Sequence, residues 1–205
     1  MFDALFTTTT EYQKLSHALS GKGACALFGL PASGRAQVYA ALCRQLDKPL
    51  CIVTPGEAEA TRFAADLNTL GIPTAVFPAR DYVLRPIEGT AREYEYRRLA
   101  VLGELVGGRL RAVAVPAEAL TQFTTPKEDF CANTRTLHAG DTLLRDDLLA
   151  ALFGAGYTRR AQVDGPGQFS VRGDIVDIFA PDQKMPVRME FWGDEIDTLH
   201  TFDLT

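Results

Sequence analysis

Short apolar runs alternate with helical segments over the first 120 residues. Four helices are predicted: a short polar one over 10–20, two with apolar residues at helical spacing over 34–47 and 57–70, and one over 90–105 that begins with a capping-box pattern. Between them lie short apolar runs of the kind that forms buried strands: 24–30, 50–53, 74–77 and 112–115. Strands that alternate with helices of this length predict βαβ units around a doubly wound parallel sheet.

The pattern changes after about residue 120. One further helix is predicted over 145–154, and β-type runs follow at 169–179, 187–192 and 198–202. Short intervals with Gly and Pro between these runs favour antiparallel hairpins. We therefore expect two domains, an α/β domain over 1–120 and a small α+β antiparallel domain over 121–205.

The charge of the chain is uneven. Its 205 residues carry a net charge of −5, and 46% of them are hydrophobic, which excludes a disordered chain. Residues 126–205 hold 8 Lys and Arg against 14 Asp and Glu, so the acidity belongs to the second domain. A broad nucleic-acid-binding surface is therefore disfavoured.

No metal or redox site is predicted from the cysteines and histidines. None of the four cysteines has the C-x-x-C spacing, and His17, His138 and His200 are far apart in the sequence. The start of the chain lacks a signal-peptide pattern, and no apolar run approaches the ~20 residues of a membrane helix. We expect a reduced, cytoplasmic protein without a metal site.

Residues 29–36 have the glycine spacing of a phosphate-binding loop. Gly29 and Gly34 stand five residues apart, after a predicted strand and before a predicted helix, as in G-x-x-x-x-G-K-[ST]. Arg35 replaces the lysine, and Ala36 replaces the hydroxyl residue that would hold Mg²⁺. The motif therefore predicts a degenerate P-loop, and the alternative is a plain strand-to-helix turn.

Residues 187–192 alternate cleanly between two faces of a strand. Val187, Met189 and Phe191 share the face that should enter the core. The other face carries Arg188, Glu190 and Trp192, the only tryptophan in the chain.

Arg172 lies in the neighbouring β-type run and could join the face of Arg188. Arg and Trp are the residues most enriched at binding hot spots, which favours a protein-docking surface. The alternative is structural: Trp192 covers the edge of a small core, and Arg188 and Glu190 form an exposed ion pair of little energetic value. Spacing leaves both interpretations open.

Two segments resemble bacterial nucleotide-excision-repair proteins. Residues 167–179, GQFSVRGDIVDIF, are similar to G-x-F-x-x-R-G-D-I-x-D-I-F, and residues 187–197, VRMEFWGDEID, to V-R-x-E-F-F-G-D-E-I-[DE]. Both segments occur in the helicase subunit UvrB and in the transcription-repair coupling factor, Mfd. Together they cover the β-rich part of the chain.

Three features favour the coupling-factor family within this resemblance. Its first domain is a RecA-like, P-loop NTPase-type fold with a decayed P-loop. Residues 77–81, FPARD, resemble its F-P-A-x-D segment, and the interval 79–90 is too short for the long DNA-threading hairpin of UvrB. The resemblance implies a UvrB-like degenerate RecA-type domain over 1–120 and a UvrB-like domain 2 over 121–205.

The resemblance also implies a partner. In this family the β-rich domain docks UvrA, and Arg172 and Arg188 fall on its UvrA-contacting arginines. Trp192 falls on a contacting aromatic that is usually Phe, and Glu190 is a weaker candidate on the same face. We expect a monomeric, non-catalytic adaptor that recruits UvrA to stalled RNA polymerase.

Further domains are implied by the same resemblance. Family members are longer ATP-dependent DNA translocases, and RNA polymerase, DNA, ATP and Mg²⁺ would be bound by domains absent here. We expect no cofactor in this chain, which would be an N-terminal portion of such a protein. The alternative is the N-terminal part of a UvrB-like ATP-dependent helicase, for which tight Mg²⁺-dependent ATP binding would be decisive.

Overall fold

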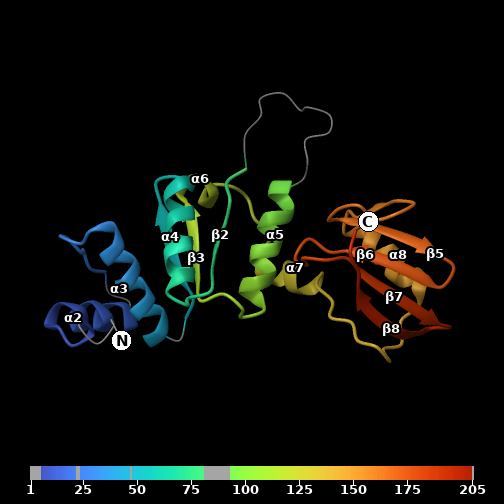
Figure 1. The fold of residues 1–205 in the computed structure, drawn as a ribbon, viewed down its shortest axis with the longest axis horizontal. Coiled ribbons are helices and arrows are strands. Elements are labelled where there is room, and N and C mark those ends of the chain that lie inside the picture. The colour runs from blue at the N-terminus through green and yellow to red at the C-terminus, as the bar shows by residue number, and fades with distance from the viewer. Residues whose placement is uncertain (1–5, 22–23, 47, 81–92, 205) are drawn as a thin grey trace, which may run out of the picture. The chain divides into compact units, whose positions relative to one another are not determined.

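The computed structural model describes residues 6–21, 24–46, 48–80 and 93–204 (Figure 1). The chain forms two compact units, of which one comprises Met1–Ile87 and Glu104–Gln122. The other comprises Glu88–Gly103 and Phe123–Thr205. The predicted boundary at residue 120 stays a prediction.

The first unit contains a parallel sheet with helices packed against it. Its elements are α2 (Thr10–Ser20), α3 (Ala32–Gln45), β1 (Leu50–Thr54), α4 (Glu57–Thr69), β2 (Thr74–Val76), β3 (Ala112–Pro116) and α6 (Ala117–Leu120). The strand order is β1-β3-β2, and both pairings are parallel. Figure 1 shows α4 lying along β2 and β3. The predicted α/β pattern with a parallel sheet is confirmed.

The strand predicted over residues 24–30 is wrong. The run was expected to be a buried strand, but it has no strand conformation, and Phe28 is 88% exposed. An apolar run becomes a buried strand only where another strand offers it backbone hydrogen bonds. None of the three described strands of this sheet pairs with residues 24–30.

Small and branched side chains close the interface between helices and sheet in the first unit. Cys43 of α3 and Leu67 of α4 pack with Ile52 of β1 and Ala112 of β3 in one buried cluster. The helical periodicity seen in the sequence therefore marks the faces that bury these residues.

The second unit is a five-stranded sheet with short helices. Its elements are most of α5 (Glu93–Val106), α7 (Lys127–Ala132), α8 (Arg145–Gly154), β4 (Thr158–Arg159), β5 (Gln168–Arg172), β6 (Ile175–Phe179), β7 (Val187–Trp192) and β8 (Glu195–Thr201). The order is β4-β5-β6-β7-β8, and β5 to β8 pair antiparallel. The predicted antiparallel hairpins are confirmed, but the single run predicted over 169–179 is two strands, β5 and β6, because Gly173 and Asp174 form a turn inside it. The sequence analysis missed β4, α6 and α7, which are too short to show a period.

Two Gly-Asp turns set the register of the hairpins. Arg172 pairs with Ile175 across Gly173, and Trp192 pairs with Glu195 across Gly193. Both glycines have positive φ, 61° and 62°, which a two-residue hairpin turn requires and which other residues rarely adopt. The first turn therefore decides which side chains of β5 and β6 lie opposite one another, and the second does the same for β7 and β8.

One face of this sheet forms the core of the second unit. Leu148 and Leu152 of α8 pack with Phe169, Val176 and Ile196. In Figure 1 helix α8 lies against these strands. The opposite face of the sheet carries polar side chains such as Ser170 and Asp177, together with Ile175 and the buried Phe179. In the described part of the chain, no helix has both the length and the apolar character needed to cross a membrane.

Candidate protein-docking surface

The predicted docking residues lie on the face of the second sheet that is turned away from α8. Arg172 ends β5, while Arg188, Glu190 and Trp192 alternate along β7, and β6 lies between the two strands. Met189 and Phe191 belong to the core cluster, whereas Val187 at the start of β7 is half-buried and lies outside it. The predicted alternation is therefore confirmed by burial for residues 189–192.

A register shift near the end of β7 does not disturb this arrangement. Glu190 pairs with Thr198, whereas Phe191 pairs with Ile196, so the extra residue of the bulge is in β8. Trp192 consequently keeps the same side of β7 as Arg188. Its side chain is 84% exposed, so it does not cover the edge of the core as the structural alternative proposed.

The two arginines meet at one buried carboxylate. Asp177, in the middle of β6, is 2% exposed. It accepts hydrogen bonds from Arg188 Nε at 2.6 Å and Arg188 Nη2 at 2.9 Å. It also accepts one from Arg172 Nη2 at 2.9 Å, and the Ser170 hydroxyl lies 3.4 Å from the same carboxylate. Arg188 therefore pairs with Asp177, not with Glu190 as the structural alternative had it.

The electrostatics of the cluster follow from this pairing. Burial by itself would raise the pKa of the Asp177 carboxyl, but hydrogen bonds from Arg188 and Arg172 and their positive charges lower it below its ordinary value. The hydrogen bond to Asp177 raises the pKa of Arg188, and the nearby charge of Glu190 acts in the same direction. The Asp177 carboxylate and the Arg188 guanidinium therefore carry their charges at neutral pH.

An aromatic ring also lies next to the Arg188 guanidinium. Its guanidinium carbon lies 4.9 Å from the centroid of the Phe202 ring, a distance at which the cation is attracted to the ring. The side chain of Arg188 is 28% exposed, whereas that of Arg172 is 54% exposed. Arg172 is thus the more accessible of the two cations.

Asp177 is the residue of this cluster that the sequence analysis missed. Its signal is a single carboxylate inside an otherwise apolar strand, residues 175–179. A charge at such a position needs a paired partner, because an isolated buried charge is very costly. Arg172 and Arg188 on the flanking strands supply that partner, but only the sheet order shows it.

The proposed phosphate-binding loop is not confirmed. The strand expected before Gly29 is absent, as described above, and α3 already begins at Ala32, so that Gly34 lies inside the helix. The side chain of Ala36 is buried and cannot hold a metal ion. A degenerate P-loop stays a prediction.

Arg35, at the position of the P-loop lysine, is engaged by α4. Its Nη1 lies 3.8 Å from Glu59 Oε1, and its guanidinium carbon is 5.7 Å from the centre of the Phe63 ring. These contacts direct Arg35 toward a neighbouring helix and support the structural interpretation of this turn.

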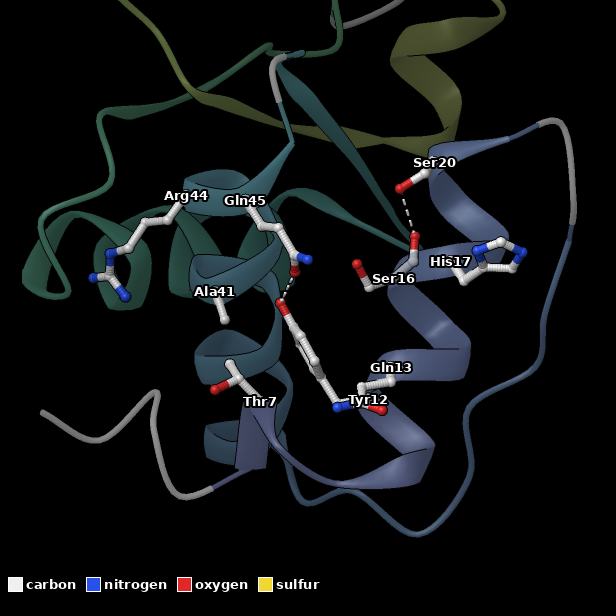
Figure 2. A pocket seen from close by; sticks show the side chains of 9 residues that line it. All are labelled: Thr7, Tyr12, Gln13, Ser16, His17, Ser20, Ala41, Arg44 and Gln45. Atoms are coloured by element: carbon white, nitrogen blue, oxygen red, sulfur yellow. Dashed lines mark hydrogen bonds between the residues drawn. The ribbon is translucent and has the colours of Figure 1, made fainter.

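An open hollow of about 610 Å³ lies between α2 and α3 (Figure 2). Tyr12 donates a hydrogen bond to Gln45 across it, and Ser20 donates one to the Ser16 carbonyl. Figure 2 shows the side chains of His17 and Arg44 pointing away from one another. These two groups therefore do not converge on one point of the hollow.

Among the described residues, no group of three or more His, Cys, Asp and Glu side chains could hold a metal ion. His17, His138 and His200 lie on α2, before α8 and on β8, respectively. The expectation that the chain carries no cofactor stays a prediction.

Comparison with known proteins shows what the chain, and the part of it that carries this surface, are similar to. Residues 136–205 match the family model described as the UvrB interaction domain. The chain is 36% identical over 208 residues to the transcription-repair-coupling factor of Mycobacterium bovis, covering 98% of this chain and 17% of that protein. It is 29% identical over 179 residues to the coupling factor of Bacillus subtilis, covering 86% of this chain and 15% of that protein.

UvrB proteins are also similar to the chain. UvrABC system protein B of Chlorobium limicola is 28% identical over 193 residues, which cover 87% of this chain and 28% of that protein. The chain therefore spans less than a third of the length of the relatives it matches. The resemblance to coupling factors and UvrB is confirmed over most of the chain.

Proposed function

We propose that this chain is the UvrA-docking region of a transcription-repair-coupling factor. In this proposal it is a monomeric, non-catalytic adaptor that recruits UvrA to stalled RNA polymerase during nucleotide excision repair. RNA polymerase, DNA and ATP would be bound by other parts of the full-length protein. The whole would act in the cytoplasm.

One observation carries the proposal. Residues 136–205 match the UvrB interaction domain, and within them an exposed face presents two arginines and a tryptophan. Charge-assisted hydrogen bonds from arginine and a large exposed aromatic are the features that dominate protein-binding hot spots. The chemistry of this face suits a partner surface with carboxylates beside an apolar pocket.

The alternative of a nucleotide-dependent helicase has less support. The residue at the Mg²⁺-binding position is a buried alanine, and Arg35 contacts α4. An adaptor role requires neither of these groups to act on a phosphate.

Titration calorimetry of the 205-residue chain with purified UvrA tests the proposal. We expect Arg188→Ala and Arg172→Ala each to weaken binding by about 2 kcal/mol, or about 30-fold. Arg135→Ala is the matched control, because Arg135 is exposed in the same unit but lies outside the sheet. Wild-type affinity in both test variants would refute docking through this face.

A further inference from the structure

Arg172 and Arg188 come from strands on opposite sides of β6, yet they converge on a single carboxylate. Asp177 pairs directly with Arg188 across β6 and β7, and with Ser170 across β5 and β6. Arg172 is two residues beyond Ser170, so it reaches Asp177 along the diagonal of the sheet. Three strands are therefore needed to assemble the cluster.

We propose that Asp177 is a positioning residue for partner docking, which holds Arg172 and Arg188 together in the orientation that an acidic surface of UvrA recognises. The inference rests on the proposed function and assigns a role to a residue that would not touch the partner. Asp177 is 2% exposed, so it can act only through the two arginines.

The first argument concerns repulsion. Two guanidinium groups placed side by side on one face repel each other, and each would turn toward solvent in the absence of a counter-charge. A nitrogen of each guanidinium group lies within 2.9 Å of the Asp177 carboxylate. The negative charge of this carboxylate offsets one of the two positive charges. The pair of cations can then face the same partner.

The second argument concerns order. A long arginine side chain loses rotamer freedom when it binds, and this cost is reduced when the side chain is held in place beforehand. Arg188 is held twice by Asp177 and is stacked on Phe202. Arg188 is therefore preordered for binding.

The third argument concerns the donors that are left over. Among the described residues, Arg172 uses Nη2 alone for Asp177, so its Nε and Nη1 can donate to a partner. Arg172 is also the more exposed cation, which makes it the main contact for a partner carboxylate. Glu190 lies on the same face, and its negative charge disfavours a partner carboxylate close to Arg188. This repulsion restricts which acidic partner surfaces can bind.

A double-mutant cycle on the full 205-residue chain with UvrA tests the proposal. Asp177→Asn keeps the size of the side chain but removes its charge, and we expect binding about tenfold weaker. In the Arg188→Ala background the same substitution should weaken binding by a clearly smaller factor, because one of the two groups it orients is gone. Asp174→Asn is the control, since Asp174 is an exposed carboxylate in the adjoining turn.

The outcomes separate the two proposals. If the arginine variants weaken binding while Asp177→Asn does not, the positioning role is overturned and the docking face stands. The role is also overturned if the effects of Asp177→Asn and Arg188→Ala simply multiply. If Arg172→Ala, Arg188→Ala and Asp177→Asn all bind like the wild-type chain, docking through this face is refuted.

A measurement on the unchanged chain covers the case in which Asp177→Asn does not fold. NMR relaxation of the arginine Nε–H groups reports how far each side chain is ordered before binding. We expect Arg188 to be nearly as rigid as the backbone and Arg135 to be mobile. Equal mobility of Arg188 and Arg135 would overturn the proposal.

Discussion

Arg188 donates two hydrogen bonds to Asp177, one to each carboxylate oxygen, at 2.6 and 2.9 Å. The two residues are direct cross-strand partners on β6 and β7, so this bidentate contact lies across the middle of the sheet. Because Arg172 binds the same carboxylate from β5, one side chain links three strands. Stability and docking are therefore expected to depend on the same cluster.

The stability of the second unit should depend on the charge of Asp177. The pKa of its carboxyl is lowered in the folded chain, so its stabilising contribution is present above the ordinary pKa of an aspartate, about 3.9. The contribution is lost as the pH falls through the lowered, folded-state value. Urea unfolding between pH 2 and pH 7 should show this loss, and Asp177→Asn should flatten the dependence in the acid range. The same pH dependence in both proteins would contradict the prediction.

Trp192 should matter for binding and not for folding. We expect Trp192→Ala to weaken UvrA binding by about 2 kcal/mol, since a large exposed aromatic on a docking face is a typical hot spot. Trp192→Phe, which restores the residue usual in the family, should bind within about threefold of the wild type. The free energy of unfolding should change by no more than about 0.5 kcal/mol in either variant, because the side chain is exposed. A large loss of stability in Trp192→Phe would argue for a structural role instead.

Phe169 should be among the residues most important for the second core. Its side chain is fully buried between the sheet and α8, and its ring meets the edge of Phe153 with centroids 5.1 Å apart. Phe169→Ala should lower the free energy of unfolding by about 3–5 kcal/mol, from lost burial and from the cavity left behind. Phe153→Ala, at the more exposed end of the same pair, should cost about 1 kcal/mol. Urea denaturation followed by circular dichroism measures both, and equal losses would contradict the assigned core.

The turn at Gly173 should tolerate no side chain without strain. Its φ of 61° costs an L-residue about 1–2 kcal/mol, so Gly173→Ala should destabilise by that amount. Gly154, at the end of α8, is the matched control, because it has no positive φ and an added Cβ there meets open space. Gly154→Ala should stabilise by about 0.5 kcal/mol. Thermal unfolding compares the stability of the two variants. Similar stability changes in both would show that backbone strain at Gly173 does not determine the effect of the substitution.

Much of this fold could be predicted from local patterns. Helix α8 occupies the residues predicted for it, 145–154, and β7 occupies 187–192, because periodicity of 3.6 or 2 residues directly reflects which side of an element is buried. The strand predicted for residues 24–30 does not form, and the reason is tertiary. Their composition suits a buried strand, but a strand needs a neighbouring strand for its backbone hydrogen bonds. Short elements such as β4 were not predicted, because two residues show no period.

The sequence by itself determined that Arg188, Glu190 and Trp192 share one face, because side chains alternate along a strand whatever surrounds it. It also indicated antiparallel hairpins from the Gly and Pro residues between its β-type runs, but the turn at Gly173 lies inside one of those runs and was not predicted. Only the tertiary structure decided that Arg172 and Arg188 meet at Asp177. That meeting depends on β5 and β7 lying on either side of β6, and on a buried charge that cannot remain without partners.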